Sequence, residues 1–323
     1  MIYYHKMKKV LSKKFEAIDW LKHINNIETM PSMKDACIRY EKDLVSIISN
    51  NRKFDKPPVL MLSGGIDSMM LGTILKKHFD LKQTFSFASV LDTYDIVQSQ
   101  KSARSLGVNN ELIVIPLDEI IENLHLVRGK KIDSVNSLMC YLMFKLGLQK
   151  AKVNNVDVLN GDGADGLLGS LKSFTYIDTP YIMRKYNVSK EVARTACKMN
   201  DYQIANDPNR KRGTGASHLI KQAIQENDCH PILPFKHREV IGWVNRLPYE
   251  FANGEKRYPK NKKIHKEFIK YMGNYDNSQE RTVMQIGTGI YEKLQDYLMQ
   301  TYKTKTPNSA VKLLVSSSST LPI

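Results

Sequence analysis

The chain has 323 residues, of which 42% are hydrophobic and 25% charged, and this ordinary globular composition excludes a largely disordered chain. Its formal charge is +15, from 48 Lys and Arg against 33 Asp and Glu, which either attracts a polyanion such as a nucleic acid or reflects a general abundance of lysine. The four cysteines form no CxxC or CxxH pair, which argues against a zinc ribbon, an iron–sulfur site and a secreted disulfide framework. We find no signal peptide and no run of about 20 apolar residues, so we expect a cytoplasmic protein without a membrane partner.

Strands and helices alternate along the first half of the chain. The apolar run VLML at residues 59–62 is typical of a strand buried on both faces. Other apolar runs predict strands at 84–90, 111–117 and 157–160, and helical periods predict helices at 69–79, 95–106 and 137–151. This alternation predicts an α/β fold with a parallel sheet, whose ligands lie at the carboxyl ends of the strands.

Four segments are predicted along the chain. Residues 1–54 are expected to form N-terminal helices, 55–170 the α/β core, 171–310 a mainly helical part without strands, and 311–323 a flexible tail.

A glycine-rich turn, SGGIDS at residues 63–68, follows the first strand and begins the next helix. Backbone N–H groups and a helix N-terminus converge there, an arrangement that favours an anion such as phosphate. Asp67 would repel a bare phosphate but is suitable if Mg²⁺ lies between its carboxylate and a pyrophosphate. The absence of GxxxxGK[ST] argues against a P-loop that transfers a γ-phosphate. A helix N-cap without a ligand is the simpler alternative.

The hexapeptide resembles the pyrophosphate loop of the N-type ATP pyrophosphatases, which cleave ATP between the α- and β-phosphates and adenylate a substrate. The resemblance implies a parallel five-stranded sheet of the adenine nucleotide α-hydrolase type with flanking helices, and it implies that Asp67 holds Mg²⁺. It implies further nucleotide contacts at Leu62 and at the backbone of Phe87, which is otherwise a core strand residue. The residues implied to grip pyrophosphate are Ser63, Gly64, Gly65 and Ser68.

A second glycine-rich turn lies in LNGDGADGLLGS, residues 159–170, after the fourth predicted strand. GDGADG fits the GxGxxG dinucleotide fingerprint, but its two carboxylates would face the pyrophosphate of that cofactor, so we reject this interpretation. The whole string resembles the LSGEGADELFGG segment of asparagine synthetases and β-lactam synthetases. This narrows the resemblance to the amide-forming branch of the pyrophosphatases.

The resemblance assigns roles to four residues of this turn. It implies that Asn160 and Gly161 contact the nucleotide, and that Asp165 is the second Mg²⁺ ligand, paired with Asp67. Asp162 stands where the family has a glutamate tied to forming the acyl-adenylate and to receiving a proton from the amine. A Gly/Asp turn without a ligand is the alternative.

A third region resembles two helical segments of the same family. PILPFKHREVIGWVNRLPYEF, from residue 231, resembles PFLDxxxVEFxxxLPxEL, and KNKKIHKEFIKYMG, from residue 260, resembles TKYLLREALRG. The second alignment places Lys262 on the catalytic lysine, whose ammonium would stabilise negative charge on the α-phosphate and on a tetrahedral oxyanion. Lys260 and Lys263 are competitors, because a shift of one or two residues exchanges them with Lys262, and a solvated basic helix face is the alternative role.

Several residues depart from the family pattern. Asp162 replaces a glutamate, Gly166 replaces a second glutamate, and His237 and Val283 replace an aspartate and a lysine. Residue 2 is Ile rather than the nucleophilic cysteine of a glutaminase, and about 55 residues precede the synthetase-like part, so we expect no built-in glutaminase.

The resemblance implies an ATP-dependent, AMP- and pyrophosphate-forming amide synthetase with ATP and Mg²⁺ as cofactors. Its partners would be a small carboxylate, such as an amino acid, and ammonia, another amine or a separate glutaminase as the nitrogen source. Two alternatives stay open. The net charge favours an adenylating enzyme that modifies a tRNA or DNA base, and the altered residues fit an inactive synthetase fold used for binding.

Overall fold

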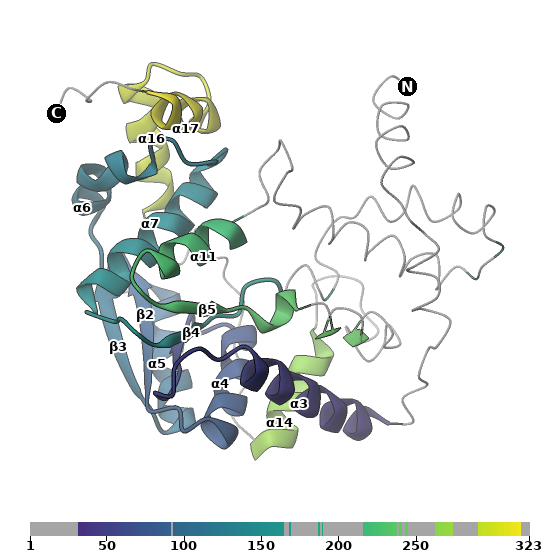
Figure 1. The fold of residues 1–323 in the computed structure, drawn as a ribbon. Helices are drawn as coiled ribbons and strands as arrows, with labels where there is room; N and C mark the ends of the chain where they lie inside the picture. The colour runs from purple at the N-terminus through teal and green to yellow at the C-terminus, as the bar shows by residue number, and fades with distance from the viewer. Residues whose placement is uncertain are drawn as a thin grey trace.

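The computed structural model describes residues 32–91, 93–164, 168, 187, 189, 216–237, 239–240, 243–244, 262–273 and 290–317. Its centre is a five-stranded sheet in the order β3-β2-β1-β4-β5, with every neighbouring pair parallel (Figure 1). The strands are β1 (Val59–Met61), β2 (Gln83–Ala88), β3 (Asn109–Val114), β4 (Asp157–Leu159) and β5 (His230–Ile232). The predicted α/β fold with a parallel five-stranded sheet is confirmed.

Helices cover both faces of the sheet (Figure 1). One face is covered by α3 (Met33–Asn50), α4 (Ile66–His78), α5 (Tyr94–Leu106) and α14 (Lys263–Gly273). The other is covered by α6 (Leu117–Glu122), η1 (Asn123–Val127), α7 (Val135–Lys150), α11 (Ser217–Gln225), α16 (Tyr291–Thr301) and α17 (Pro307–Ser316). A short 3₁₀ turn, η2 (Pro234–Lys236), follows β5. Among the described residues, no helix combines the length and apolar character needed to cross a membrane.

The apolar strands follow from this two-sided covering. In β1, Leu60 belongs to the core beneath α4 and α14, whereas its neighbour Met61 belongs to the core beneath α7. Leu159 and Val158 divide in the same way in β4. Because successive side chains of a strand point to opposite faces, a strand buried on both needs apolar residues at every position.

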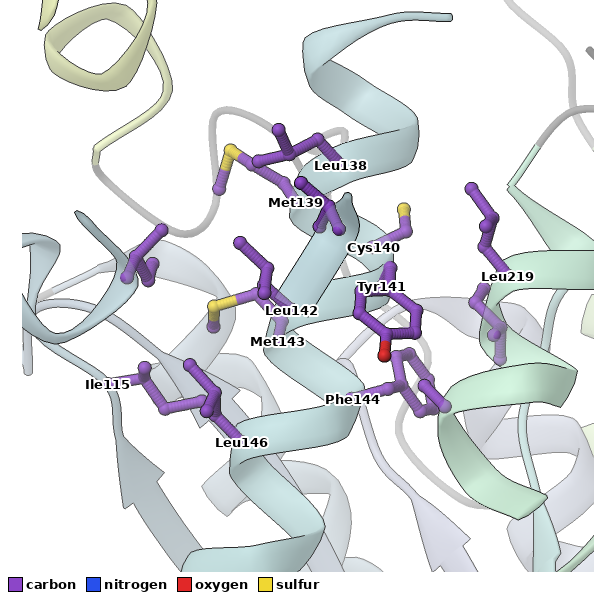
Figure 2. Packing of buried hydrophobic residues seen from close by; sticks show 14 of the residues in the cluster. Ile115, Leu138, Met139, Cys140, Tyr141, Leu142, Met143, Phe144, Leu146 and Leu219 are labelled. Carbon is purple, nitrogen blue, oxygen red and sulfur yellow. The ribbon is translucent and has the colours of Figure 1, made fainter. Parts of the chain in front are cut away.

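The middle of helix α7, from Leu138 to Phe144, is apolar around its whole circumference because it is enclosed on several sides. Figure 2 shows Tyr141 and Phe144 pointing toward α11, while Leu142 and Met143 point toward Ile115 at the end of β3. A helix without a polar face is stable only when it is buried in this way.

The described parts of the predicted segments all pack around one sheet. Helix α3 packs on α4 and α14, and β5 extends the sheet beyond β4. The prediction of no strand after residue 171 was therefore wrong at residues 230–232. This strand is only three residues long and contains Pro231, which is tolerated because β5 is at the edge of the sheet.

The chain is also ordered further toward its end than the predicted tail, 311–323, allows. Helix α17 continues to Ser316 and buries Val311 and Leu314. It begins at a strong start site, since the Thr306 side chain accepts a hydrogen bond from the Ser309 N–H and a proline opens the first turn. The flexible-tail prediction therefore began too early.

Candidate active site

The two glycine-rich turns follow neighbouring strands at the point where the sheet changes direction. The chain runs from β1 outward to β2 and β3, then returns to place β4 on the other side of β1. Leu60 pairs with Leu159, so the turns after β1 and β4 emerge side by side. Ligands of open α/β sheets bind at such a switch point, at the carboxyl ends of the strands.

The first loop, residues 63–68, is held by its own serines. The Ser63 N–H donates to Ser68 Oγ at 3.3 Å, the two hydroxyls are 3.1 Å apart, and Ser68 Oγ donates to the Gly65 carbonyl at 2.9 Å. Gly65 is the N-cap of α4 and provides no side-chain cap. The N–H groups in the first turn of a helix have no intrahelical acceptor, so this end of α4 suits an anion.

The two glycines of this loop have different tasks. Gly64 has φ +75°, and a Cβ there would lie 2.7 Å from both Gln98 Cβ and Ser99 N, so only glycine lets the loop pack on α5. Among the described residues, a Cβ at Gly65 would meet only Ser63 Oγ, at 3.4 Å. The described part of the chain therefore leaves the space before the N-terminus of α4 open on the Gly65 side.

The second loop, whose described residues are 160–164, packs directly on the first. A Cβ at Gly161 would lie 3.1 Å from Ser68 N and 3.2 Å from Asp67 Cβ, so the two backbones meet at van der Waals distance. The Asp162 N–H donates to Asn160 Oδ1 at 2.9 Å and fixes the turn. The two glycine-rich turns are therefore in direct contact at Gly161, whereas the predicted pairing of Asp67 with Asp165 falls on a residue outside those described.

Two polar atoms of the second loop are buried without a hydrogen-bond partner among the described residues. They are Asn160 Nδ2, in a side chain that is 4% exposed, and Asp162 Oδ2. Buried polar atoms nearly always have a partner, so this pair marks a place where a ligand can supply one. Burial, with the charge of Asp162 adding to it, raises the pKa of the Cys140 thiol on α7 to about 12.

Lys262 joins the first loop from far along the chain. It precedes α14 directly, has φ +42° and is 3% exposed, and its ammonium contacts Asp67 Oδ2. The second oxygen, Asp67 Oδ1, lies 2.8 Å from His265 Nδ1, one turn into α14. Both carboxylate oxygens therefore have a partner, one from the residue before α14 and one from its first turn.

This contact sets the charge of the Asp67 carboxylate. Burial raises its pKa, but the charge of Lys262 and the hydrogen bond from His265 outweigh burial and lower the pKa to about 2. The side chain is 18% exposed and ionised, and it lies beside two serine hydroxyls, so it supplies the hard oxygen donors that Mg²⁺ prefers. Among the described residues there is no group of three His, Cys, Asp or Glu that could hold a metal, and the predicted partner ligand, Asp165, lies outside them.

The family model for asparagine synthase matches residues 40–279. The chain belongs to the asparagine synthase family. This is a family of ATP-dependent ligases that form C–N bonds. A similar solved structure is the NH3-dependent NAD synthetase from Campylobacter jejuni subsp. jejuni NCTC 11168, 16% identical, with a TM-score of 0.35 over 61% of this chain and 95% of that chain. A search of the curated proteins finds no match.

Two further residues of this asparagine synthase family member, Leu62 and Phe87, were predicted to contact the nucleotide. They lie directly after β1 and within β2. Leu62 is buried, its N–H donates to the Phe85 carbonyl at 2.7 Å, and its carbonyl accepts from Ser86 Oγ at 2.6 Å. The Phe87 ring packs on Gly147 of α7, which makes its side chain a structural element and leaves only its backbone for adenine. Four residues named from the sequence lie outside the described residues: Asp165, Gly166, Lys260 and Val283.

Three residues at this site escaped the sequence analysis. His265 is three residues after Lys262 and so on the same helix face, a spacing that signals proximity once Lys262 is chosen. Tyr40, whose hydroxyl lies 3.0 Å from His265 Nε2, has no local signal because it comes from α3. Lys236 was not singled out from the sequence, yet its side chain covers Gly163, where a Cβ would lie 2.7 Å from Lys236 Cε.

Proposed function

We propose that this chain is an AMP- and pyrophosphate-forming amide synthetase, which adenylates a carboxylate with ATP and transfers the acyl group to ammonia or another amine. The observation that carries the proposal is the meeting of three distant segments at one loop. Lys262 contacts Asp67, and Gly161 packs on the backbone between Asp67 and Ser68. A cation, an ionised carboxylate and an open helix N-terminus are together suited to a nucleotide triphosphate.

The proposal places the phosphates of ATP at the N-terminus of α4. The backbone of Gly64 and Gly65 and the hydroxyls of Ser63 and Ser68 bind pyrophosphate there. Asn160 Nδ2 then gains the acceptor that it lacks among the described residues, and the Gly161 backbone lies beside it. The backbone at Leu62 and Phe87 contacts the adenine base.

The residues of the first loop fit Mg²⁺, which Asp67 would hold together with Asp165. When bound, the ion neutralises charge on the leaving pyrophosphate.

Two further side chains act on the substrate. Lys262 stabilises negative charge as the carboxylate attacks the α-phosphorus, and again on the oxyanion formed when the amine attacks the acyl carbon. Asp162, whose Oδ2 has no hydrogen-bond partner among the described residues, accepts the proton that the amine loses.

The test is pyrophosphate release across a panel of carboxylates, with ammonia or simple amines as acceptors. We expect carboxylate-dependent release in the wild type and its loss in Asp67→Ala and Lys262→Ala. Lys263→Ala, which removes the adjacent lysine, is the matched control and should retain release. Full activity in both Asp67→Ala and Lys262→Ala would rule out these assignments.

The net charge of +15 supports a second candidate, an adenylating enzyme that acts on a tRNA or DNA base. In that case RNA or DNA binding would weaken steeply with salt, and nucleic acid would stimulate pyrophosphate release. Absence of release with every carboxylate and every nucleic acid would favour an inactive binding subunit. A glutaminase that stimulates release with glutamine would identify a separate nitrogen source.

A further inference from the structure

Two buried side chains, His265 and Tyr40, form a chain of hydrogen bonds that ends on Asp67, the carboxylate that is proposed to hold Mg²⁺. His265 Nδ1 lies 2.8 Å from Asp67 Oδ1, and His265 Nε2 lies 3.0 Å from the Tyr40 hydroxyl. His265 and Tyr40 are both 0% exposed. Because ionised Asp67 accepts a hydrogen bond, Nδ1 carries a proton, and in a neutral ring Nε2 accepts the tyrosine hydroxyl.

The two oxygens of Asp67 face different surroundings. Oδ1 faces His265, which is enclosed by aromatic rings, while Oδ2 faces the ammonium of Lys262. Tyr40 stacks on His265 with ring centroids 5.8 Å apart, and Phe235 lies on the imidazole at 5.2 Å. The histidine ring is thus held in one orientation by packing as well as by its hydrogen bonds.

The tyrosine end of this chain of hydrogen bonds is anchored as well. The Tyr40 ring stacks on Trp243 at 4.8 Å and meets Phe268 edge-on at 5.7 Å. Helix α3, which carries Tyr40, thereby connects to the first loop through α14.

We infer that His265 is a positioning residue that fixes Asp67 Oδ1, so that Oδ2 is presented to the metal of the bound nucleotide once Lys262 moves to the phosphates, and that Tyr40 fixes the histidine ring. This inference rests on the proposed function. Groups that hold a metal ligand in place typically change metal affinity or activity by roughly 10- to 100-fold when removed. A group that only supports the fold would affect nucleotide binding with and without metal alike.

The experiment compares the affinities for MgATP and for ATP in EDTA, measured by calorimetry on the full chain. We expect His265→Leu to weaken MgATP binding by roughly 10- to 100-fold and metal-free ATP binding by less than about twofold. His265→Asn, whose amide can replace the Nδ1–H donor, should keep most of the affinity, and Tyr40→Phe should lie between wild type and His265→Leu.

A double variant separates positioning from simple destabilisation. His265→Leu leaves the buried Tyr40 hydroxyl without its partner, and Tyr40→Phe/His265→Leu removes that hydroxyl too. If the double variant binds MgATP as weakly as His265→Leu, the histidine positions Asp67; if binding recovers, the inference is overturned. Tyr141→Phe, which removes a buried hydroxyl bonded to Glu226 in the other core, is the matched control and should bind normally.

The outcomes also distinguish this inference from the proposed function. No binding of MgATP by the wild type would defeat the proposed function itself. Normal binding by the wild type with equal losses for MgATP and metal-free ATP in His265→Leu, or with no loss, would overturn only the role of His265.

Discussion

The ammonium of Lys262 rests on the carboxylate of Asp67, although 195 residues separate them in the chain. In the structure, the Lys262 ammonium, which is the proposed catalytic cation, therefore contacts Asp67 Oδ2, the oxygen that is proposed to bind Mg²⁺. Under the proposed function, Lys262 leaves Asp67 for the phosphates when ATP and metal bind, and a divalent cation takes its place. The pair keeps both buried charges compensated until then.

Removal of Lys262 is expected to have opposite effects on metal binding and on catalysis. Lys262→Ala frees Asp67 Oδ2, so Mg²⁺ alone should bind tighter by about tenfold, which corresponds to a competing interaction of about 1.4 kcal/mol. Carboxylate-dependent pyrophosphate release should be lost in the same variant. Mn²⁺ binding followed by electron paramagnetic resonance, together with a pyrophosphate assay, measures both quantities.

The control for this variant is Lys270→Ala, which removes a lysine 58% exposed on the same helix. It should change neither metal affinity nor release. Weaker metal binding in Lys262→Ala than in the wild type would contradict the competition between lysine and metal.

The low pKa of Asp67 predicts a specific acid sensitivity of the metal-free protein. Its folded-state pKa of about 2 lies below the ordinary value of 3.8, so the unfolded chain binds this proton more readily and the contact stabilises the fold above about pH 4. That stabilisation is lost as the pH falls toward 2. The stability advantage of wild type over Asp67→Asn should therefore shrink by roughly 2 kcal/mol between pH 5 and pH 2.

Urea unfolding at several pH values measures this advantage. Asp80→Asn, at a carboxylate that is 69% exposed, controls for the loss of an acid on the surface. A constant difference between wild type and Asp67→Asn across this range would show that Lys262 and His265 do not lower the pKa of Asp67.

Two glycines with positive φ separate the cost of backbone strain from the cost of a clash. Gly107 ends α5 at φ +61°, and no atom of the described residues lies within 4 Å of a Cβ there, so Gly107→Ala should cost about 1 kcal/mol of unfolding free energy. Gly64 adds contacts of 2.7 Å with α5, so Gly64→Ala should cost about 3 kcal/mol and weaken nucleotide binding. Chemical denaturation of both variants measures the difference, and equal costs would argue against close packing of the first loop on α5.

The proposed base is tested by a substitution that preserves its shape. Asp162→Asn removes the proton acceptor and should lower kcat/KM for the amine by about 100-fold, while the affinity for MgATP changes little. Asp162→Glu, which restores the residue of the family segment, should retain most of the activity. A normal rate in Asp162→Asn would exclude Asp162 as the acceptor of the amine proton.

The elements that the sequence predicted best are those whose pattern is local. The central strand β1 is apolar throughout because both faces of the sheet are covered, and the loop after β1 carries its glycines and serines within six residues. The fifth strand was missed because three residues with a proline become a strand only by pairing with β4. The end of the chain was misjudged because the burial of α17 comes from its packing on α7 and η1.

The sequence by itself determined an α/β sheet with glycine-rich turns after its first and fourth strands, since strand burial, turn geometry and helix start are properties of short segments. Only the tertiary structure decided which side chains meet at those turns. Asp67, Lys262, His265 and Tyr40 come from α4, the start of α14 and α3, and their contacts depend on where each helix packs on the sheet. Hydrogen bonds between residues about 200 positions apart cannot be predicted from hydrophobic periodicity, because the local pattern does not depend on the distant partner.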